Sequence, residues 1–182
     1  MKKSILAFAA LILAACNSLP EGEFRIRGTV TDPALEGACI FLVPVTEPVI
    51  EPTKENLDST FIEGGKFEFR GTVERLADIR LEKMRRIGTQ SLLVVTEPGD
   101  IRVTIGAVSS GGGTPQNDSL QVWKVLTERH NVETLAASKS GLSHTADSVH
   151  RAYRTRSQQM AAALEGTTFG DWLSKMYPPL NK

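Results

Sequence analysis

Apolar and polar residues alternate with period two through much of residues 23–107, and this pattern limits the possible folds more than any other feature of the sequence. It is clearest in the first such segment, where the apolar or small positions are Phe24, Ile26, Gly28 and Val30 and the polar ones are Arg25, Arg27, Thr29 and Thr31. The same alternation returns at residues 66–70 and 101–105. It is typical of strands with one buried and one solvated face. The sequence therefore predicts sheets that pack on a second apolar layer.

Apolar runs and turn residues complete the strand prediction. Residues 39–45 form a continuous apolar run that predicts a central strand, and residues 92–95 are apolar on both faces. Gly64-Gly65 permits the positive φ of a tight hairpin turn, and Glu97-Pro98-Gly99-Asp100 has the residues of a type II turn. We predict a mainly β fold with C-terminal α structure, in which an antiparallel β-sandwich or open barrel of six to seven strands spans residues 23–107 and precedes two to three helices.

A change of pattern follows the strands. Residues 108–114 are rich in Ser and Gly and predict a hinge, and residues 115–182 predict a helical region. Thr114 is expected to be the N-cap of the first helix and Pro115 its first residue, where a missing N–H costs nothing. The apolar stripe of this helix is expected to contain Leu120, Trp123, Leu126 and Leu135.

Two further helices are predicted after Gly141. Ser143 is the expected cap of the second helix, which ends at Gly166, and a short third helix is expected at residues 171–176. The second helix has one apolar face at helical spacing. Its members are Ala146, Val149, Tyr153, Met160 and Leu164.

The first 16 residues have the organisation of an export sequence. Two lysines precede the apolar run at residues 5–12, which is shorter than the about 20 residues that a membrane-spanning helix needs. Residues 1–15 are therefore expected to be a signal peptide. The ending Leu13-Ala14-Ala15-Cys16 resembles the lipobox of bacterial lipoproteins. The resemblance implies cleavage before Cys16 and acylation of its sulfur, so that the protein has the membrane as a partner.

Residues 16–22 are expected to be a lipidated tether. They are polar, contain Pro20 and have no periodicity. Asn17 follows the lipid site, whereas an aspartate there usually accompanies retention in the inner membrane. By that resemblance we expect a lipoprotein of the cell envelope, attached to the outer membrane.

Cysteine content and net charge argue against a protein with an internal disulfide and against a nucleic-acid-binding protein. If Cys16 carries lipid, Cys39 is the one remaining thiol, so an intramolecular disulfide is not expected, and its apolar surroundings predict a buried small hydrophobe. The chain has 21 basic and 21 acidic residues. This balance gives no electrostatic reason to expect nucleic acid as a partner.

Several segments together resemble a known family. They are residues 24–30, 40–43, 58–59, 64–71, 97–101 and 113–118. In this order they resemble the N-terminal domains of unknown function that precede thioredoxin-like, AhpC/TSA-type domains in many lipoproteins of anaerobes. The resemblance covers roughly residues 24–123 and implies a β-rich module followed by helices. The family has no assigned catalytic residues, so none is transferred to this chain.

The sequence departs from the longer members of that family because it contains no Cys-x-x-Cys pair. Disulfide exchange needs one thiol to attack and a second to resolve. We therefore expect a stand-alone form of the accessory module, without dithiol chemistry of its own.

The other candidate sites are expected to have structural roles. His144, Asp147 and His150 share a predicted helix, but the two histidines lie about 240° apart around it and would not face one metal. Residues 109–113 precede a helix N-terminus but lack the lysine and spacing of a phosphate loop. No Gly-x-Ser-x-Gly elbow is present, and His130 is expected to be boundary packing. No catalytic residue, cofactor or metal site is predicted.

Four aromatic residues lie in the predicted helices: Trp123, Tyr153, Trp172 and Tyr177. Such residues suit interfaces, but here they are expected to close one side of the sandwich.

Two functional predictions remain. The first is a non-catalytic, membrane-anchored envelope lipoprotein that acts as a binding or interaction module, with an envelope protein as a possible partner. The alternative is an accessory protein to a separate thioredoxin-like oxidoreductase.

Overall fold

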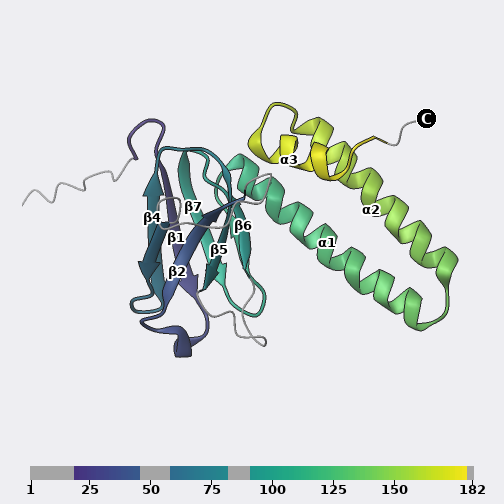
Figure 1. Ribbon diagram of the computed structural model, residues 1–182, viewed down its shortest axis with the longest axis horizontal. Coiled ribbons are helices and arrows are strands. Elements are labelled where there is room, and N and C mark those ends of the chain that lie inside the picture. Colours follow the sequence, from purple (N-terminus) through teal and green to yellow (C-terminus); the bar gives the residue numbers. More distant parts are fainter. Residues whose placement is uncertain (1–18, 46–57, 82–90, 180–182) are drawn as a thin grey trace, which may run out of the picture.

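The computed structural model describes residues 19–45, 58–81 and 91–179, and within them two four-stranded sheets face each other (Figure 1). Sheet A has the order β4-β1-β7-β8 and consists of β1 (Phe24–Val30), β4 (Lys66–Gly71), β7 (Gly99–Ile105) and β8 (Ser110–Gly112). Sheet B has the order β3-β2-β5-β6 and consists of β2 (Cys39–Pro44), β3 (Asp58–Phe61), β5 (Leu76–Leu81) and β6 (Leu92–Val95). The predicted sandwich is confirmed, and the sheets do not close into a barrel.

Sheet A is mixed, although the period-two pattern predicts antiparallel strands. β1 pairs antiparallel with β4 but parallel with β7, in a register that runs from Phe24 opposite Gly99 to Val30 opposite Ile105. Parallel neighbours need a long crossover. Here the chain leaves β1 through a short 3-10 helix, η1 (Pro33–Leu35), and forms β2 and β3 of sheet B. It then adds β4 to sheet A and forms β5 and β6 of sheet B before it returns to sheet A as β7.

The alternating apolar residues of both sheets meet in one core. Ile26, Ile40, Leu42, Ile79 and Ile101 have no exposed surface. Burying such a side chain contributes about 1.5–3 kcal/mol. The core therefore fixes which face of each strand points inward, and it leaves the intervening polar residues of sheet A on the outside.

The Gly64-Gly65 turn has the predicted geometry but joins strands of different sheets. Both glycines have positive φ, 58° and 67°, and Glu63 and Lys66 exchange two backbone hydrogen bonds across them. The Glu36 carboxylate accepts hydrogen bonds from both glycine N–H groups, which lowers the pKa of Glu36. β3 then pairs with β2, while β4 pairs with β1. The turn thus passes the chain from one sheet to the other.

The segment predicted as a Gly/Ser hinge contains a strand. β8 pairs antiparallel with β7, with Val103 opposite Gly111. A Cβ at Gly111 would lie 3.3 Å from the side chain of Leu92, so the lack of a side chain lets the strand fit against the core. Composition indicates flexibility here, but the available edge of β7 supplies hydrogen bonds that order the segment.

Three helices follow: α1 (Pro115–Lys139), α2 (Ser143–Ala163) and α3 (Thr168–Met176). α1 and α2 form an antiparallel hairpin that projects away from the sandwich, and α3 lies back beside the start of α1 (Figure 1). α2 begins one residue earlier than predicted, because its N-cap is Leu142 and Ser143 is already helical. None of the described helices is long and apolar enough to cross a lipid bilayer.

A second apolar cluster attaches the helices to sheet B. Leu76 and Val95 on the outer face of sheet B pack with Leu120, Phe169 and Leu173 of the helices. The rings of Trp123, Trp172 and Tyr177 surround this cluster. The prediction that the aromatic residues close one side of the sandwich is confirmed for these three.

The N-terminus of α1 is capped by a residue from another segment. Thr114 holds the predicted N-cap position with extended backbone, but its side chain accepts no bond from the helix backbone. Instead, Glu97 Oε1 accepts hydrogen bonds from Gln116 N at 2.7 Å and Asn117 N at 3.0 Å. The Asn117 side chain in turn bonds both N and O of Val95. The start of α1 thereby satisfies the free edge of β6.

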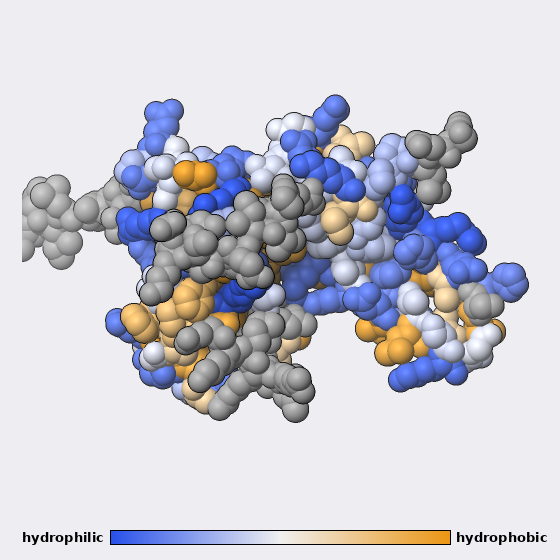
Figure 2. All heavy atoms as spheres, in the orientation of Figure 1, coloured by the Kyte–Doolittle hydropathy of each residue, from blue (hydrophilic) through white to orange (hydrophobic). Residues whose placement is uncertain are grey.

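Two sequence-based burial predictions need correction. Leu135, expected in the buried stripe of α1, is 56% exposed because that part of the helix extends beyond the sandwich. Val122, Val125 and Val132 of α1 are also exposed, and hydrophobic surface is visible toward the far end of the hairpin (Figure 2). Cys39 is half-buried rather than buried, because β2 turns it away from the core that Ile40 and Leu42 enter.

Candidate functional site

Charged side chains gather on the outer face of sheet A. Three cross-strand rows run across β4, β1 and β7. In strand order they are Arg70-Arg25-Asp100, Glu68-Arg27-Arg102 and Lys66-Thr29-Thr104. Five basic side chains therefore share this face with two acidic ones. We call these nine residues the basic face, which stands out in a chain whose overall formal charge is zero.

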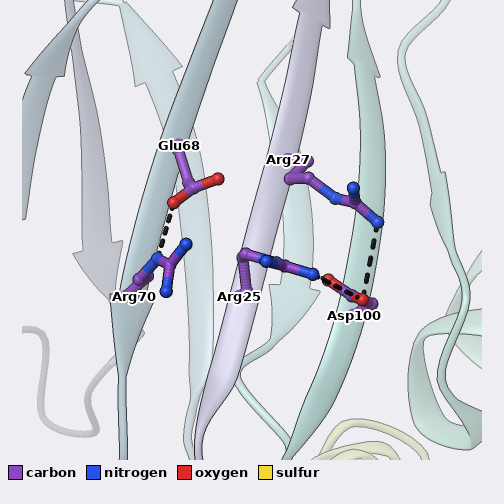
Figure 3. Close-up of polar contacts among 5 residues, drawn as sticks. All are labelled: Arg25, Arg27, Glu68, Arg70 and Asp100. Atoms are coloured by element: carbon purple, nitrogen blue, oxygen red, sulfur yellow. Dashed lines mark hydrogen bonds and ion pairs between the residues drawn. The ribbon is translucent and has the colours of Figure 1, made fainter. Parts of the chain in front are cut away.

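The basic face is organised around Asp100. Both guanidinium groups of β1 point toward its carboxylate, as Figure 3 shows. Arg25 donates two hydrogen bonds to it, Nε to Oδ1 at 2.7 Å and a terminal nitrogen to Oδ2 at 2.8 Å, and the nearest Arg27 nitrogen lies 3.5 Å from Oδ2. Such a bidentate pair holds the Arg25 fork in one orientation. On β4, Glu68 and Arg70 form a separate pair at 2.6 Å.

These contacts set the charge states. The hydrogen bond from Arg25, together with the positive charges of Arg25, Arg27 and Arg102, lowers the pKa of Asp100. The same hydrogen bond raises the pKa of Arg25. Both groups are therefore charged at neutral pH, and Asp100 neutralises Arg25 more fully than the more distant Arg27 and Arg102.

A hollow of about 580 Å³ lies on the same face, toward the ends of β1 and β7. Its charged lining residues are Arg27, Lys66 and Arg102, and its hydroxyl groups come from Thr29, Thr104 and Ser110. None of the described residues that line it is acidic. Within the described part of the chain, Lys66 and Arg102 make no ion pair. The hollow thus presents donors and positive charge to any ligand that enters it.

The outer face of sheet B carries a different feature, a half-buried carboxylate. Asp78 lies between Val43 and Leu93 on the neighbouring strands. Burial raises the pKa of Asp78, against opposing contributions from a Ser91 hydrogen bond and from Arg80. Its Oδ1 atom is buried and has no hydrogen-bond partner in the described structure. Asp78 carries no distinguishing signal in the sequence, since its place in β5 is a normal polar position of the alternating pattern.

The histidines group differently from the predicted cluster. His144 and Asp147 are exposed on α2, whereas His150 lies against His130 of α1, with His150 Nδ1 3.4 Å from His130 Nε2. His130 is half-buried, in agreement with its prediction as boundary packing, and its ring stacks on Tyr153 at 4.3 Å. No group of three or more His, Cys, Asp and Glu suited to a metal occurs among the described residues.

Other predicted site residues are placed as follows. Cys16 and the lipobox residues Leu13, Ala14 and Ala15 lie outside the described residues, and so does Asn17. Ser109 is fully buried and bonds the backbone of Gly106 rather than facing a ligand.

Tyr153, the fourth aromatic residue, is buried inside the helical hairpin. Its hydroxyl lies 2.9 Å from that of Thr127 and 2.7 Å from that of Tyr177. Burial, followed by the contact with Tyr153, raises the pKa of Tyr177. This hydroxyl chain ties α2 to α1 and to the end of α3.

The basic face could not be predicted from the sequence, because the face depends on the register in which the strands pair. The alternation identified Arg25, Arg27 and Arg102 as outward-facing, but each segment alone contains a common mixture of charges. The parallel pairing of β1 with β7 places Arg25 beside Asp100 and Arg27 beside Arg102. A pairing of β1 with another strand would have given a different pattern of charge.

Residues 24–120, more than half of the chain, match the model of the family described as Domain of unknown function (DUF4369). No curated protein and no solved structure matches the sequence. The match begins with β1 and ends in the first turns of α1, so it contains both sheets and the contact of α1 with β6. The chain therefore belongs to the DUF4369 family of domains of unknown function.

Proposed function

We propose that this protein is a non-catalytic, membrane-anchored interaction module of the cell envelope, and that it binds an acidic partner through the basic face of sheet A. The observation that carries the proposal is the hollow lined by Arg27, Lys66 and Arg102. Planar guanidinium groups recognise carboxylate and phosphate groups well, because two parallel N–H donors match two acceptor oxygens.

The arrangement favours binding over catalysis. The side chains gathered in the hollow are cations and hydroxyl groups, which donate hydrogen bonds to an anion. The described lining contains no carboxylate or imidazole that would act as a general base. Asp100 serves to orient Arg25 and is already occupied by two hydrogen bonds.

The anchor in this proposal is Cys16, on the strength of the lipobox resemblance. A lipid on Cys16 would leave a short tether before β1, which starts at Phe24. The anchor would therefore attach the sandwich at the Phe24 end of β1, which lies between β4 and β7 in the basic face. Replacement of Cys16 by serine should release the protein from the membrane fraction. Retention of the Cys16→Ser protein on washed membranes would contradict the anchor.

The binding proposal is tested by a crosslinking pull-down from membranes. Arg27→Glu combined with Arg102→Glu reverses two charges of the hollow, and Arg151→Glu on exposed α2 is the matched control. We expect the control to capture the same partners as the wild type and the double variant to lose them. Capture should also weaken with salt, since exposed charges are screened. Equal capture by both variants would refute binding through the basic face.

The resemblance to modules that precede thioredoxin-like domains supports the alternative, an accessory to a separate oxidoreductase. A thioredoxin-like protein among the specific partners would favour it. A deletion strain whose envelope proteins keep their normal disulfide status would count against it.

A further inference from the structure

Two histidines from different helices meet on the α1–α2 hairpin, far along the chain from the basic face. His130 Nε2 and His150 Nδ1 are 3.4 Å apart, and their ring centroids are 5.5 Å apart. Hydrogen bonds from N–H groups are mostly about 2.7–3.2 Å long. The two nitrogens therefore make only a long hydrogen bond, and they are also close enough to share a bound ion.

The separation fits two ligands of one metal ion. Zinc binds imidazole nitrogen at about 2.0–2.1 Å with tetrahedral geometry. Two ligand atoms at neighbouring corners of such a tetrahedron are then about 3.3–3.4 Å apart. The observed distance between His130 Nε2 and His150 Nδ1 has this value.

The structure also holds one of the two rings in place before any ion binds. The His130 ring stacks on Tyr153 with an interplanar angle of 21°. The Tyr153 hydroxyl is itself fixed between Thr127 and Tyr177. A ligand whose orientation is set by its neighbours loses little freedom on binding. His150 is exposed, so its side of the pair remains open to water and ions.

We propose that His130 and His150 form a two-histidine site for a divalent late transition-metal ion, zinc or copper, which would bridge α1 and α2. Imidazole nitrogen suits both ions, and copper binds such ligands more tightly than zinc. No third His, Cys, Asp or Glu joins the pair among the described residues. Water completes the coordination, which leaves positions for an external ligand.

The site is tested with the full chain, purified in detergent without a histidine tag and titrated with Zn²⁺ in a calorimeter. The informative variants are His150→Ala and His130→Gln, of which the second keeps a neutral polar side chain. His144→Ala is the matched control, since His144 is exposed on the same helix and outside the pair. We expect each pair variant to weaken Zn²⁺ binding at least tenfold and His144→Ala to change it less than twofold.

A second measurement identifies the ligands directly. In the electron paramagnetic resonance spectrum of the Cu²⁺-loaded wild type, we expect coupling to two imidazole nitrogens, and to one in each pair variant. No Zn²⁺ binding by the wild type, equal weakening by His144→Ala, or sulfur ligation from Cys39 would each overturn the proposal. Far-UV circular dichroism confirms that the variants keep their helices.

Discussion

Replacing Glu97 with alanine should loosen the start of α1 from the edge of sheet B. Glu97 Oε1 accepts two backbone hydrogen bonds, from Gln116 and Asn117, and both of these residues are buried. Each buried donor left without a partner costs about 1–3 kcal/mol, and loss of a helix cap costs about 0.5–2 kcal/mol. The unpaired donors and the lost cap are the same contacts described in two ways, so the two costs do not add in full. We expect the free energy of unfolding to fall by about 2–4 kcal/mol. For a chain of this size, that lowers Tm by roughly 10 °C.

The assay is urea unfolding followed by tryptophan fluorescence, because Trp123 and Trp172 both border the apolar cluster that joins the helices to sheet B. Glu97→Gln keeps the acceptor oxygen and removes the charge, so it should cost about 1 kcal/mol or less. Glu133→Ala removes an exposed pair with Arg129 and should change the stability little. If Glu97→Ala were no worse than Glu133→Ala, or if Glu97→Gln were as harmful as Glu97→Ala, the capping role would be refuted.

Three further predictions concern stability. Asp78→Asn should raise the urea midpoint at pH 7, because the raised pKa of folded Asp78 means that its ionisation opposes folding. This gain in midpoint should vanish below about pH 4, where the carboxyl is protonated in the unfolded chain too. A gain that does not depend on pH would be inconsistent with this cause. Gly28→Ala should cost about 1–3 kcal/mol, since its Cβ would overlap the ring of Phe67, and unchanged thermal unfolding would show that the ring moves freely. Phe169→Ala should cost about 3–5 kcal/mol, because Phe169 has no exposed surface; unaltered tryptophan fluorescence and midpoint would show that α3 is not docked as described.

The strand pattern was predictable because alternation is a local property. Burial of Ile26 and Ile101 follows directly from period two, and the positive φ of Gly64 and Gly65 follows from their lack of a side chain. The order of strands in a sheet is not local. The sequence gives no local sign that β1 pairs in parallel with β7, which is the pairing that brings Arg25 to Asp100.

In the helices, too, local features were predictable from the sequence and contacts with distant residues were not. Thr114 and Pro115 located the start of α1, but the acceptor that caps it belongs to Glu97, which lies in the turn before β7. Leu135 fits the helical stripe in sequence yet is exposed, because the hairpin extends beyond the sheet that buries Leu120. His150 shares its helix with His144 in the sequence, whereas its neighbour in space is His130 of α1.

Photo-crosslinking in living cells would show whether the basic face of sheet A contacts a partner in the envelope. A photoreactive amino acid replaces Thr29, which is exposed within the hollow, or Thr155, which is exposed on α2. We expect a discrete crosslinked product from position 29 that is absent from position 155 and disappears when Arg102→Glu is added. Crosslinks from position 155 alone, or products from position 29 that persist with Arg102→Glu, would contradict binding at the basic face.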